Sequence, residues 1–358
     1  MSAVHDLATP CLVVDQDLLD ANIDAMAALS ARLQVALRPH VKTHKIPAIA
    51  ERQLAAGARG LCVATVSEAE VFARAGFTDL FLAYPLWVGP AKGRRLRSLL
   101  EAADLTIGVD STEGAQALAA QLGQERGRVR VLIEVDSGHH RSGVSPADAG
   151  AMADVAAHAG LDVRGVFTFP GHGYAPGAMA DVAAQEADAL SAGADALREV
   201  GLEPQVLSGG STPTAASTAA GAMTEMRPGV YVFGDAQQWE LGTTSPDRIA
   251  LVCLATVVSH AGGRVVLDAG SKVLGADRAS WATGYGRLLD HPDTRVVLLS
   301  EHHAVVEWDQ SPLPPIGSPM RVVPNHVCNA VNLSDEIVVV SNGVVVDTWP
   351  VAARGANT

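Results

Sequence analysis

The feature that most constrains the fold of this chain is a regular alternation of short apolar runs with alanine-rich segments between residues 35 and 233. Each apolar run has the length of a buried strand, and the segments between the early and middle runs show helical spacing of apolar residues. We expect eight strands, at residues 35–37, 61–64, 80–84, 106–109, 129–135, 163–169, 205–207 and 230–233. This pattern is typical of parallel βαβ units that close into a (β/α)8 TIM-like barrel.

The pattern changes after Asp235, where helical periodicity stops and β-rich runs follow. These runs lie at residues 249–258, 264–267, 295–300, 305–308, 320–323 and 336–347. Ser341-Asn342-Gly343 separates two valine runs and predicts a hairpin turn, because asparagine and glycine tolerate the positive φ that such turns require. We therefore predict an α/β barrel domain over residues 15–235 and a C-terminal β-rich domain over residues 236–358.

Charge and composition exclude several classes of partner. The chain of 358 residues has 26 Lys and Arg against 39 Asp and Glu, a net charge of −13, which disfavours nucleic acid and anionic membranes. No targeting segment or membrane-length apolar run is visible, and four scattered cysteines do not form a disulfide framework. We expect a cytoplasmic protein.

A basic cluster, Arg38-Pro39-His40-Val41-Lys42-Thr43-His44-Lys45, follows the first strand of the expected barrel. Catalytic residues of α/β barrels collect at the carboxyl ends of strands. Neighbouring positive charge and partial burial both disfavour the ammonium form of a lysine here, and a neutral amine is what Schiff-base chemistry requires. The same residues also fit a basic helix start on the surface.

Further candidates follow later strands of the expected barrel. Arg141 lies in a polar segment after the strand at 129–135, and it is a candidate donor to a cofactor oxygen unless it pairs with Asp136. His172 and Tyr174 occupy a glycine-bracketed turn. The small residues after the strand at 205–207 suit a phosphate held by backbone N–H groups, or an ordinary glycine-serine turn: Ser208, Gly209, Gly210, Ser211 and Thr212.

His326 and Cys328 form the most distinctive pair in the β-rich region. In an extended segment residues two apart point to the same side, so both side chains could bind one ion. Imidazole and thiolate favour zinc, and two protein ligands leave positions open for water or substrate. A half-buried strand pair is the alternative. His302 and His303 are a second polar feature, and one of them could face the site.

Five motifs in this chain occur in the same order as in a known family. They are Arg38-Pro39-His40-Val41-Lys42-Thr43-His44-Lys45, Ser208-Gly209-Gly210-Ser211-Thr212-Pro213-Thr214, Arg227-Pro228-Gly229-Val230-Tyr231-Val232-Phe233, Asp268-Ala269-Gly270-Ser271-Lys272 and Pro324-Asn325-His326-Val327-Cys328. The chain resembles the D-threonine aldolase and D-serine dehydratase family, whose fold is that of alanine racemase. The resemblance covers essentially the whole chain.

The resemblance implies pyridoxal 5′-phosphate (PLP) on Lys42, with Lys45 outside the covalent role, and Arg141 near the phenolic oxygen of the cofactor. It implies a phosphate cup formed by residues 208–212 with Gly229 and Tyr231. His326 and Cys328 would hold a divalent metal. A homodimer with shared active sites is also implied, as is an N-terminal strand, within residues 1–14, that joins the β domain.

The resemblance leaves two reactions on D-3-hydroxy amino acids. Removal of the α-proton by Lys42 and loss of a metal-held hydroxyl gives a 2-oxo acid and ammonia, as in D-serine dehydratase. Removal of the hydroxyl proton, by His172 or a metal-bound water, gives glycine and an aldehyde, as in D-threonine aldolase. Cys328 favours the dehydratase and zinc, because aldolase members typically carry Asp there; manganese or magnesium is the alternative ion. Alternatives of another class are a racemase and a non-catalytic PLP carrier.

Overall fold

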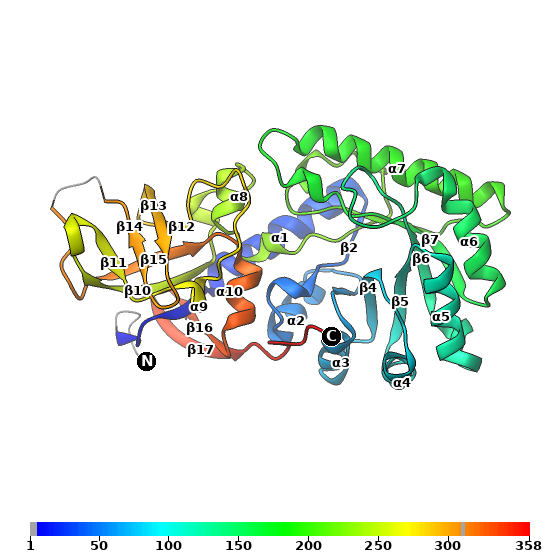
Figure 1. Ribbon diagram of the computed structural model, residues 1–358, viewed down its shortest axis with the longest axis horizontal. Coiled ribbons are helices and arrows are strands. Elements are labelled where there is room, and N and C mark those ends of the chain that lie inside the picture. The colour runs from blue at the N-terminus through cyan, green and yellow to red at the C-terminus, as the bar shows by residue number, and fades with distance from the viewer. Residues whose placement is uncertain (1–5, 309–311) are drawn as a thin grey trace. The chain divides into compact units, whose positions relative to one another are not determined.

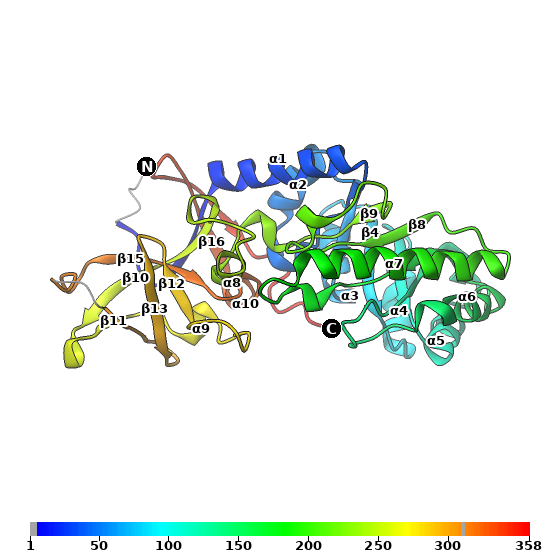
Figure 2. The same cartoon turned by 90° about the horizontal axis from the view of Figure 1, so that it is seen from above.

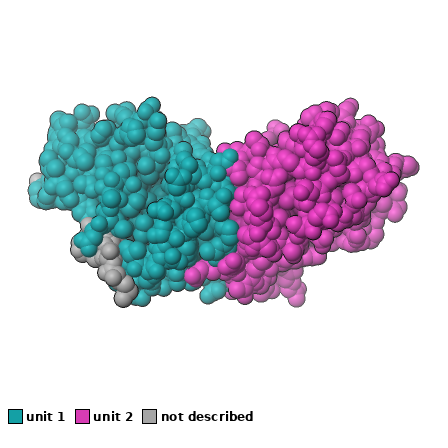
Figure 3. All heavy atoms as spheres, turned by 90° about the horizontal axis from the view of Figure 1, so that it is seen from below, with its two compact units in different colours: residues 1–25, 43–49, 230–355 teal, residues 26–42, 50–229, 356–358 magenta. Residues whose placement is uncertain are grey.

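The computed structural model describes residues 6–308 and 312–358, and these form two compact units (Figure 3). Unit 1 comprises the described residues within Met1–Ala25, Thr43–Ile49 and Val230–Gly355, and unit 2 comprises Met26–Lys42, Ala50–Gly229 and Ala356–Thr358. The predicted domain limits, 15–235 and 236–358, stay a prediction. Residues 1–5 of the expected N-terminal segment lie outside the described residues. No helix within the described ranges is long and apolar enough to cross a membrane.

Unit 2 contains an eight-stranded parallel sheet in the order β2-β9-β8-β7-β6-β5-β4-β3. A single parallel bridge between His40 and Cys62 links the β2 edge to the β3 edge. Its strands are β2 (Ala36–Leu37), β3 (Leu61–Val63), β4 (Asp79–Pro85), β5 (Asp104–Val109), β6 (Arg130–Glu134), β7 (Asp162–Phe167), β8 (Val206–Gly209) and β9 (Glu225–Met226). The expected TIM-like barrel is confirmed.

Helices lie on the outer side of these strands (Figure 1, Figure 2). They are α2 (Pro47–Ala55), α3 (Val66–Arg74), α4 (Pro90–Leu99), α5 (Thr112–Leu122), α6 (Ala149–His158) and α7 (Met179–Glu199); α1 (Gln16–Leu33) precedes them. Local sequence starts several of these helices. Thr65 caps α3 by accepting from the Glu68 N–H, while the Glu68 carboxylate accepts from the Ala64 N–H.

Aromatic side chains fill the interior of the barrel. Phe81 of β4 and Phe167 of β7 meet edge to face with ring centroids 5.2 Å apart, and both are buried. Gly108 of β5 makes room for them, because a Cβ at this position would lie 2.5 Å from Phe167 Cζ. Close packing of this kind leaves the open space of the barrel at its two ends.

The eighth barrel strand is not where the sequence pattern placed it. The run at 230–233 forms a 3-10 turn over Val230–Val232, and the strand is β9, which pairs in parallel with β2 and β8. The N–H groups of Phe233 and Gly234 both donate to the Val230 carbonyl, so this buried apolar run satisfies its backbone locally. Apolar character predicted its burial, but not its conformation.

Unit 1 contains a nine-stranded sheet in the order β11-β14-β13-β12-β15-β10-β1-β16-β17, and an additional β10–β11 pairing closes part of it. Its strands are β1 (Cys11–Asp15), β10 (Leu251–Ser259), β11 (Val265–Leu267), β12 (Gly286–Leu288), β13 (His291–Leu299), β14 (Ala304–Val306), β15 (Pro319–Pro324), β16 (Glu336–Ser341) and β17 (Val344–Pro350). The pairs are antiparallel except that β1 runs parallel to β16. The expected C-terminal β-rich region is confirmed.

The hairpin predicted at Ser341-Asn342-Gly343 is present. Ser341 pairs with Val344, and Asn342 and Gly343 have φ values of 50° and 75°. Three short helices also occur in this region, where the sequence indicated only strands: α8 (Ala236–Glu240), α9 (Ser271–Leu274) and α10 (Val327–Leu333). Helix α10 begins inside the segment expected to hold a metal.

Candidate active site

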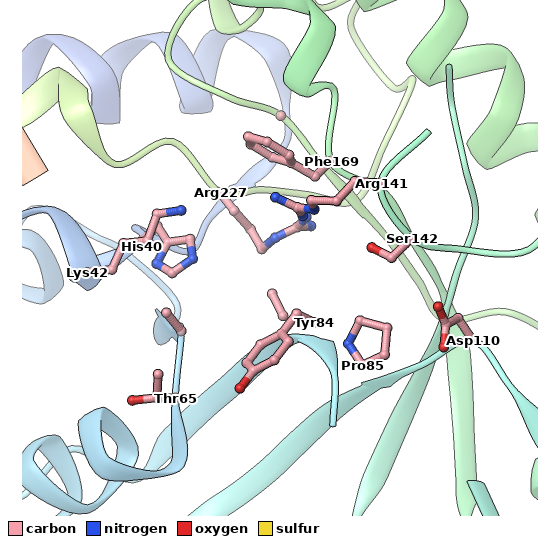
Figure 4. Close-up of a pocket in the computed structure, with 13 residues that line it drawn as sticks. His40, Lys42, Thr65, Tyr84, Pro85, Asp110, Arg141, Ser142, Phe169 and Arg227 are labelled. Carbon is pink, nitrogen blue, oxygen red and sulfur yellow. The ribbon is translucent and has the colours of Figure 1, made fainter. Parts of the chain in front are cut away.

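A cavity of about 500 Å³ opens at the carboxyl end of the barrel in unit 2 (Figure 4). Its volume lies in the range of small-molecule sites, ~300–1,000 Å³. Each of the eight strands contributes to its wall from its last residues or from the loop that follows. In order from β2 to β9, the lining residues are His40 and Lys42, Ala64 and Thr65, Ala83, Tyr84 and Pro85, Asp110, Arg141 and Ser142, Phe169, Gly210, and Arg227.

Lys42 lies in a 3-10 turn, Val41–Thr43, in the segment that follows β2. Its Nζ is 5.9 Å from the centroid of the Phe169 ring, and within the described part of the chain it forms no ion pair. Lys45, three residues later, has φ of 56°, is buried, and donates from Nζ to the Ala353 carbonyl at 3.2 Å in unit 1. Of the two lysines in the motif, Lys42 therefore lines the cavity.

Arg141 reaches the same cavity from the loop after β6. Its guanidinium lies 4.9 Å from the centroid of the Phe169 ring, and no carboxylate of the described residues pairs with it. The alternative pairing with Asp136 does not occur: that carboxylate bonds to His140 Nδ1 at 2.7 Å and accepts from two backbone N–H groups of the loop. Arg141 is therefore available to an anionic ligand.

Arg227 forms part of the cavity wall and was not singled out from the sequence. It is buried, with its guanidinium 5.5 Å from the centroids of both Phe81 and Phe167. It donates to the Ser208 hydroxyl at 2.5 Å and to the Thr168 carbonyl at 2.6 Å. The only sequence signal for Arg227 was its place as the first residue of one of the five family motifs.

Of the seven residues expected to form the phosphate cup, only Gly210 lines the cavity. The Ser208 hydroxyl donates to Glu225 at 2.7 Å, inside the barrel. Ser211 is buried and exchanges hydrogen bonds with Thr214, their hydroxyls being 3.0 Å apart. The cup roles of all seven residues stay predictions, and Tyr231 is buried in the 3-10 turn of unit 1.

His172 and Tyr174 follow β7 but are absent from the cavity wall. His172 lies in the 3-10 turn Gly171–Gly173, its Nε2 is 2.8 Å from Gln185 Oε1, and its ring stacks on His139 with centroids 6.3 Å apart. The Tyr174 ring centroid is 6.2 Å from that of Phe169. Their proposed catalytic and cofactor roles stay predictions.

A buried carboxyl lies behind the wall formed by Asp110, Arg141 and Ser142. Glu134, at the end of β6, is 2 % exposed and accepts a hydrogen bond from the Ser142 hydroxyl at 3.0 Å. Burial raises the pKa of Glu134 to about 7, although Ser142 and Arg141 favour its ionised form. In the sequence, Glu134 lies within the apolar run at 129–135. A charged residue in such a run was the one signal that could have identified Glu134 as a buried carboxyl group.

The segment with His326 and Cys328 is a helix start, which corrects the expected extended strand. His326 is the N-cap of α10, and Cys328 lies in its first turn. The Val327 N–H donates to Asp235, the residue that also caps α8, so the first turns of both helices are fixed together. A half-buried strand pair is thereby excluded.

The two side chains nevertheless converge in unit 1. His326 forms a side-chain hydrogen bond with Cys328, and its Nδ1 is 2.5 Å from Asp277 Oδ2. Burial lowers the pKa of His326, but Cys328, Asp277 and Asp235 outweigh it and raise that pKa well above its usual value. Asp277, 49 residues away in sequence, carried no sequence signal.

The donor set fits a metal that prefers nitrogen and sulfur. A metal-binding histidine usually hydrogen-bonds a carboxylate through its other ring nitrogen, as His326 does with Asp277. The described residues contain no group of three or more metal-binding side chains. His302 and His303 are both exposed.

Comparisons with known proteins agree with these features. Residues 14–237 match the family described as alanine racemase, N-terminal domain, and residues 250–340 match a serine dehydratase domain. A D-threonine aldolase from Arthrobacter sp. is 37% identical, with 97% of this chain and 93% of that protein aligned. A D-threo-3-hydroxyaspartate dehydratase from Delftia sp. is 36% identical over 90% of this chain and 91% of that protein.

Solved structures show the same relationship. The D-threonine aldolase from Filomicrobium marinum superposes with a TM-score of 0.91 at 33% identity and covers 99% of this chain and 98% of its own. An alanine racemase from Clostridium difficile, 14% identical with a TM-score of 0.70, shares the fold over 96% of this chain and 99% of its own. The chain therefore belongs to the alanine racemase-like family of PLP-dependent lyases that includes D-threonine aldolase and D-threo-3-hydroxyaspartate dehydratase.

Proposed function

We propose that this protein is a PLP- and metal-dependent lyase that acts on D-3-hydroxy amino acids, with elimination to a 2-oxo acid and ammonia as its main reaction. The observation that carries the proposal is Lys42 in a cavity to which all eight barrel strands contribute, together with Arg141, which has no carboxylate partner among the described residues. The relatives named above support the substrate class by their names.

The cavity has the groups that PLP needs. Lys42 supplies an amine for the cofactor aldehyde, Arg141 a cation for the phenolic oxygen, and Gly210 a close approach of backbone for the phosphate. When bound, PLP delocalises the electrons left at Cα when a bond there breaks. Lys42 would then take the α-proton at Nζ, while Phe169 and Tyr84 limit the space open to the substrate.

His326 and Cys328 would hold the metal, and Asp277 would orient the imidazole through Nδ1. The ion would supply Lewis acidity to the departing hydroxyl. Thiolate and imidazole favour zinc over manganese or magnesium. One structure of the related D-threo-3-hydroxyaspartate dehydratase, a cysteine-to-alanine mutant, is described as metal-free, which supports a metal role for Cys328.

A second candidate is aldol cleavage to glycine and an aldehyde. The relatives named D-threonine aldolase and 3-hydroxy-D-aspartate aldolase favour it. Incubating the protein with D-serine, D-threonine and D-threo-3-hydroxyaspartate, with and without a chelator, distinguishes the reactions by their products. We expect a 2-oxo acid as the main product, and we expect the chelator to abolish its formation. Glycine as the main product of D-threonine would establish the aldolase. The same yield of product with and without the chelator would contradict the metal role, and formation of the L-amino acid would favour a racemase.

Metal analysis tests the ligands separately from turnover. Cys328→Ala should lose zinc, and Cys328→Asp should bind manganese or magnesium better because carboxylate oxygen is a harder ligand. Both variants should keep the visible absorption of PLP on Lys42. Equal zinc content in the wild type and Cys328→Ala would contradict the assigned ligand.

The proposal includes a cytoplasmic location and a homodimer with shared active sites, both predicted from the sequence. Light scattering measures the oligomeric state. Mixing Lys42→Ala subunits with Cys328→Ala subunits tests the sharing, because a mixed dimer would contain one site with both native residues. Recovery of activity on mixing supports shared sites, and none in a verified mixed dimer contradicts them.

A further inference from the structure

The carboxyl group of Glu186 lies directly behind the loop that follows β8. Glu186 belongs to α7, and it is fully buried. Its Oε1 accepts a hydrogen bond of 2.6 Å from the backbone N–H of Gly210. Gly210 is also the residue of this loop that lines the cavity, so one residue contacts both the Glu186 carboxyl and the cavity.

Gly209, the last residue of β8, and Gly210, the first residue of the loop, both pack closely near this carboxyl. A Cβ at Gly209 would lie 2.5 Å from Glu186 Oε1, so any larger residue there would displace the carboxyl or the loop. Gly210 has φ of +77°, and a Cβ there would lie 2.8 Å from Met226 Cβ. The Gly209-Gly210 pair therefore lets the loop pass between Glu186 and the cavity.

The electrostatic surroundings of Glu186 are sparse. Its Oε2 is buried and, among the described residues, has no hydrogen-bond partner. Arg227, after β9, is the charged group that acts on it, while the loop presents backbone and Leu190 of α7 is apolar. Burial raises the pKa of Glu186 to about 7, although the Gly210 N–H and Arg227 favour the ionised form.

Building on the proposed function, we propose that Glu186 is a positioning residue for the phosphate group of PLP, and that phosphate binding is coupled to uptake of a proton by Glu186. The neutral carboxyl still accepts the Gly210 hydrogen bond and holds the loop in place. An ionised carboxylate would accept the same hydrogen bond more strongly, but it would repel a phosphate dianion from the other side of the loop. Glu186 therefore makes PLP binding tighter at pH 6.5 than at pH 8.5.

Equilibrium dialysis of the full chain against PLP and against pyridoxal, which lacks the phosphate, tests this coupling. Glu186→Gln is the matched variant, because it keeps a hydrogen-bond acceptor for Gly210 and has no charge. From pH 6.5 to 8.5, the ratio of PLP affinity to pyridoxal affinity should fall about tenfold more in the wild type than in Glu186→Gln, as for one pKa unit. The same change in both proteins would overturn the inference.

A measurement on the wild type alone avoids dependence on how the variant folds. Titration calorimetry in two buffers of different ionisation enthalpy gives the number of protons taken up on binding. At pH 8 the wild type should take up more protons with PLP than with pyridoxal, and equal uptake would overturn the coupling. If neither ligand becomes fixed to Lys42 by borohydride, the proposed function itself fails, which distinguishes that failure from failure of the coupling alone.

Discussion

At the amino end of the barrel in unit 2, a cavity of about 240 Å³ is lined by four arginines, Arg38, Arg59, Arg130 and Arg164. Three of these form ion pairs with carboxylates at or near strand starts: Arg38 lies 2.7 Å from Glu225, and Arg130 and Arg164 lie 3.6 and 2.7 Å from aspartates. At the carboxyl end, Lys42 and Arg141 have no such partner among the described residues.

This difference between the two ends separates charges that stabilise the fold from charges that are available to bind a ligand. The pKa of Arg38 reflects this: burial lowers it, but Glu225 and Asp79 outweigh burial and raise it above its usual value. A buried ion pair whose partner is lost is strongly destabilising, whereas an unpaired cation in an open cavity can be compensated by a bound anion. The paired charges at the amino end therefore stabilise the fold, whereas the unpaired charges at the carboxyl end are available for binding and chemistry.

The largest effect that would sharpen this comparison is on turnover. Lys42→Ala should reduce kcat by at least ~10²–10⁴-fold, because it removes both the covalent amine and the base, while the far-UV circular dichroism should remain unchanged. Borohydride reduction followed by peptide mapping should place the cofactor on Lys42. Attachment to Lys45 would break the comparison, since Lys45 is buried and bonded to Ala353 in unit 1.

At the opposite end, the expected effect is on stability. Arg38→Met leaves Glu225 and Asp79 without their main cation, and the free energy of unfolding should fall by about 3–5 kcal/mol. Urea unfolding measures this loss. The matched change at the carboxyl end, Arg141→Met, should lower PLP affinity and cost little stability because it breaks no ion pair. A loss under about 1 kcal/mol for Arg38→Met would contradict a structural role.

Glu134 gives a pH-dependent test at the carboxyl end. The pKa of Glu134 is about 7 in the folded protein and lower in the unfolded chain. As the pH rises, the carboxyl group therefore ionises in the unfolded chain before it ionises in the folded protein. Its contribution to stability is therefore full at low pH and is lost as pH rises toward 7. Glu134→Gln should be more stable than the wild type by about 2–3 kcal/mol at pH 8, but not at pH 4.5, as measured by urea unfolding. An equal difference at both pH values would argue against a buried proton.

The smallest effect is expected at Arg59. It lines the cavity at the amino end, is exposed, and forms no ion pair in the described part of the chain. Arg59→Ser should change the free energy of unfolding by less than about 0.5 kcal/mol and leave kcat unchanged. A tenfold change in kcat or KM would show that the amino-end cavity also binds a ligand, and the contrast between the two ends would fail.

Much of the fold could be predicted from sequence because its signals are local. Apolar runs predicted seven of the eight barrel strands, and Asn342-Gly343 predicted a hairpin. The eighth strand escaped because β9 has only two residues and its role depends on pairing with β2 and β8. Likewise, the prediction that His326 and Cys328 lie together was correct, but its reason was wrong. The two side chains converge at a helix start and not in a strand.

The sequence by itself determined the order of strands and helices, and hence that Lys42 and Arg141 would follow strands at one end of a barrel. Only the tertiary structure decided which charges are paired, because Arg38 and Glu225 lie 187 residues apart and meet only when the barrel closes. It also decided that Glu186 lies behind the Gly209-Gly210 loop and that Asp277 meets His326. Periodicity depends on neighbours along the chain, whereas ion pairs and buried carboxyls depend on neighbours in space.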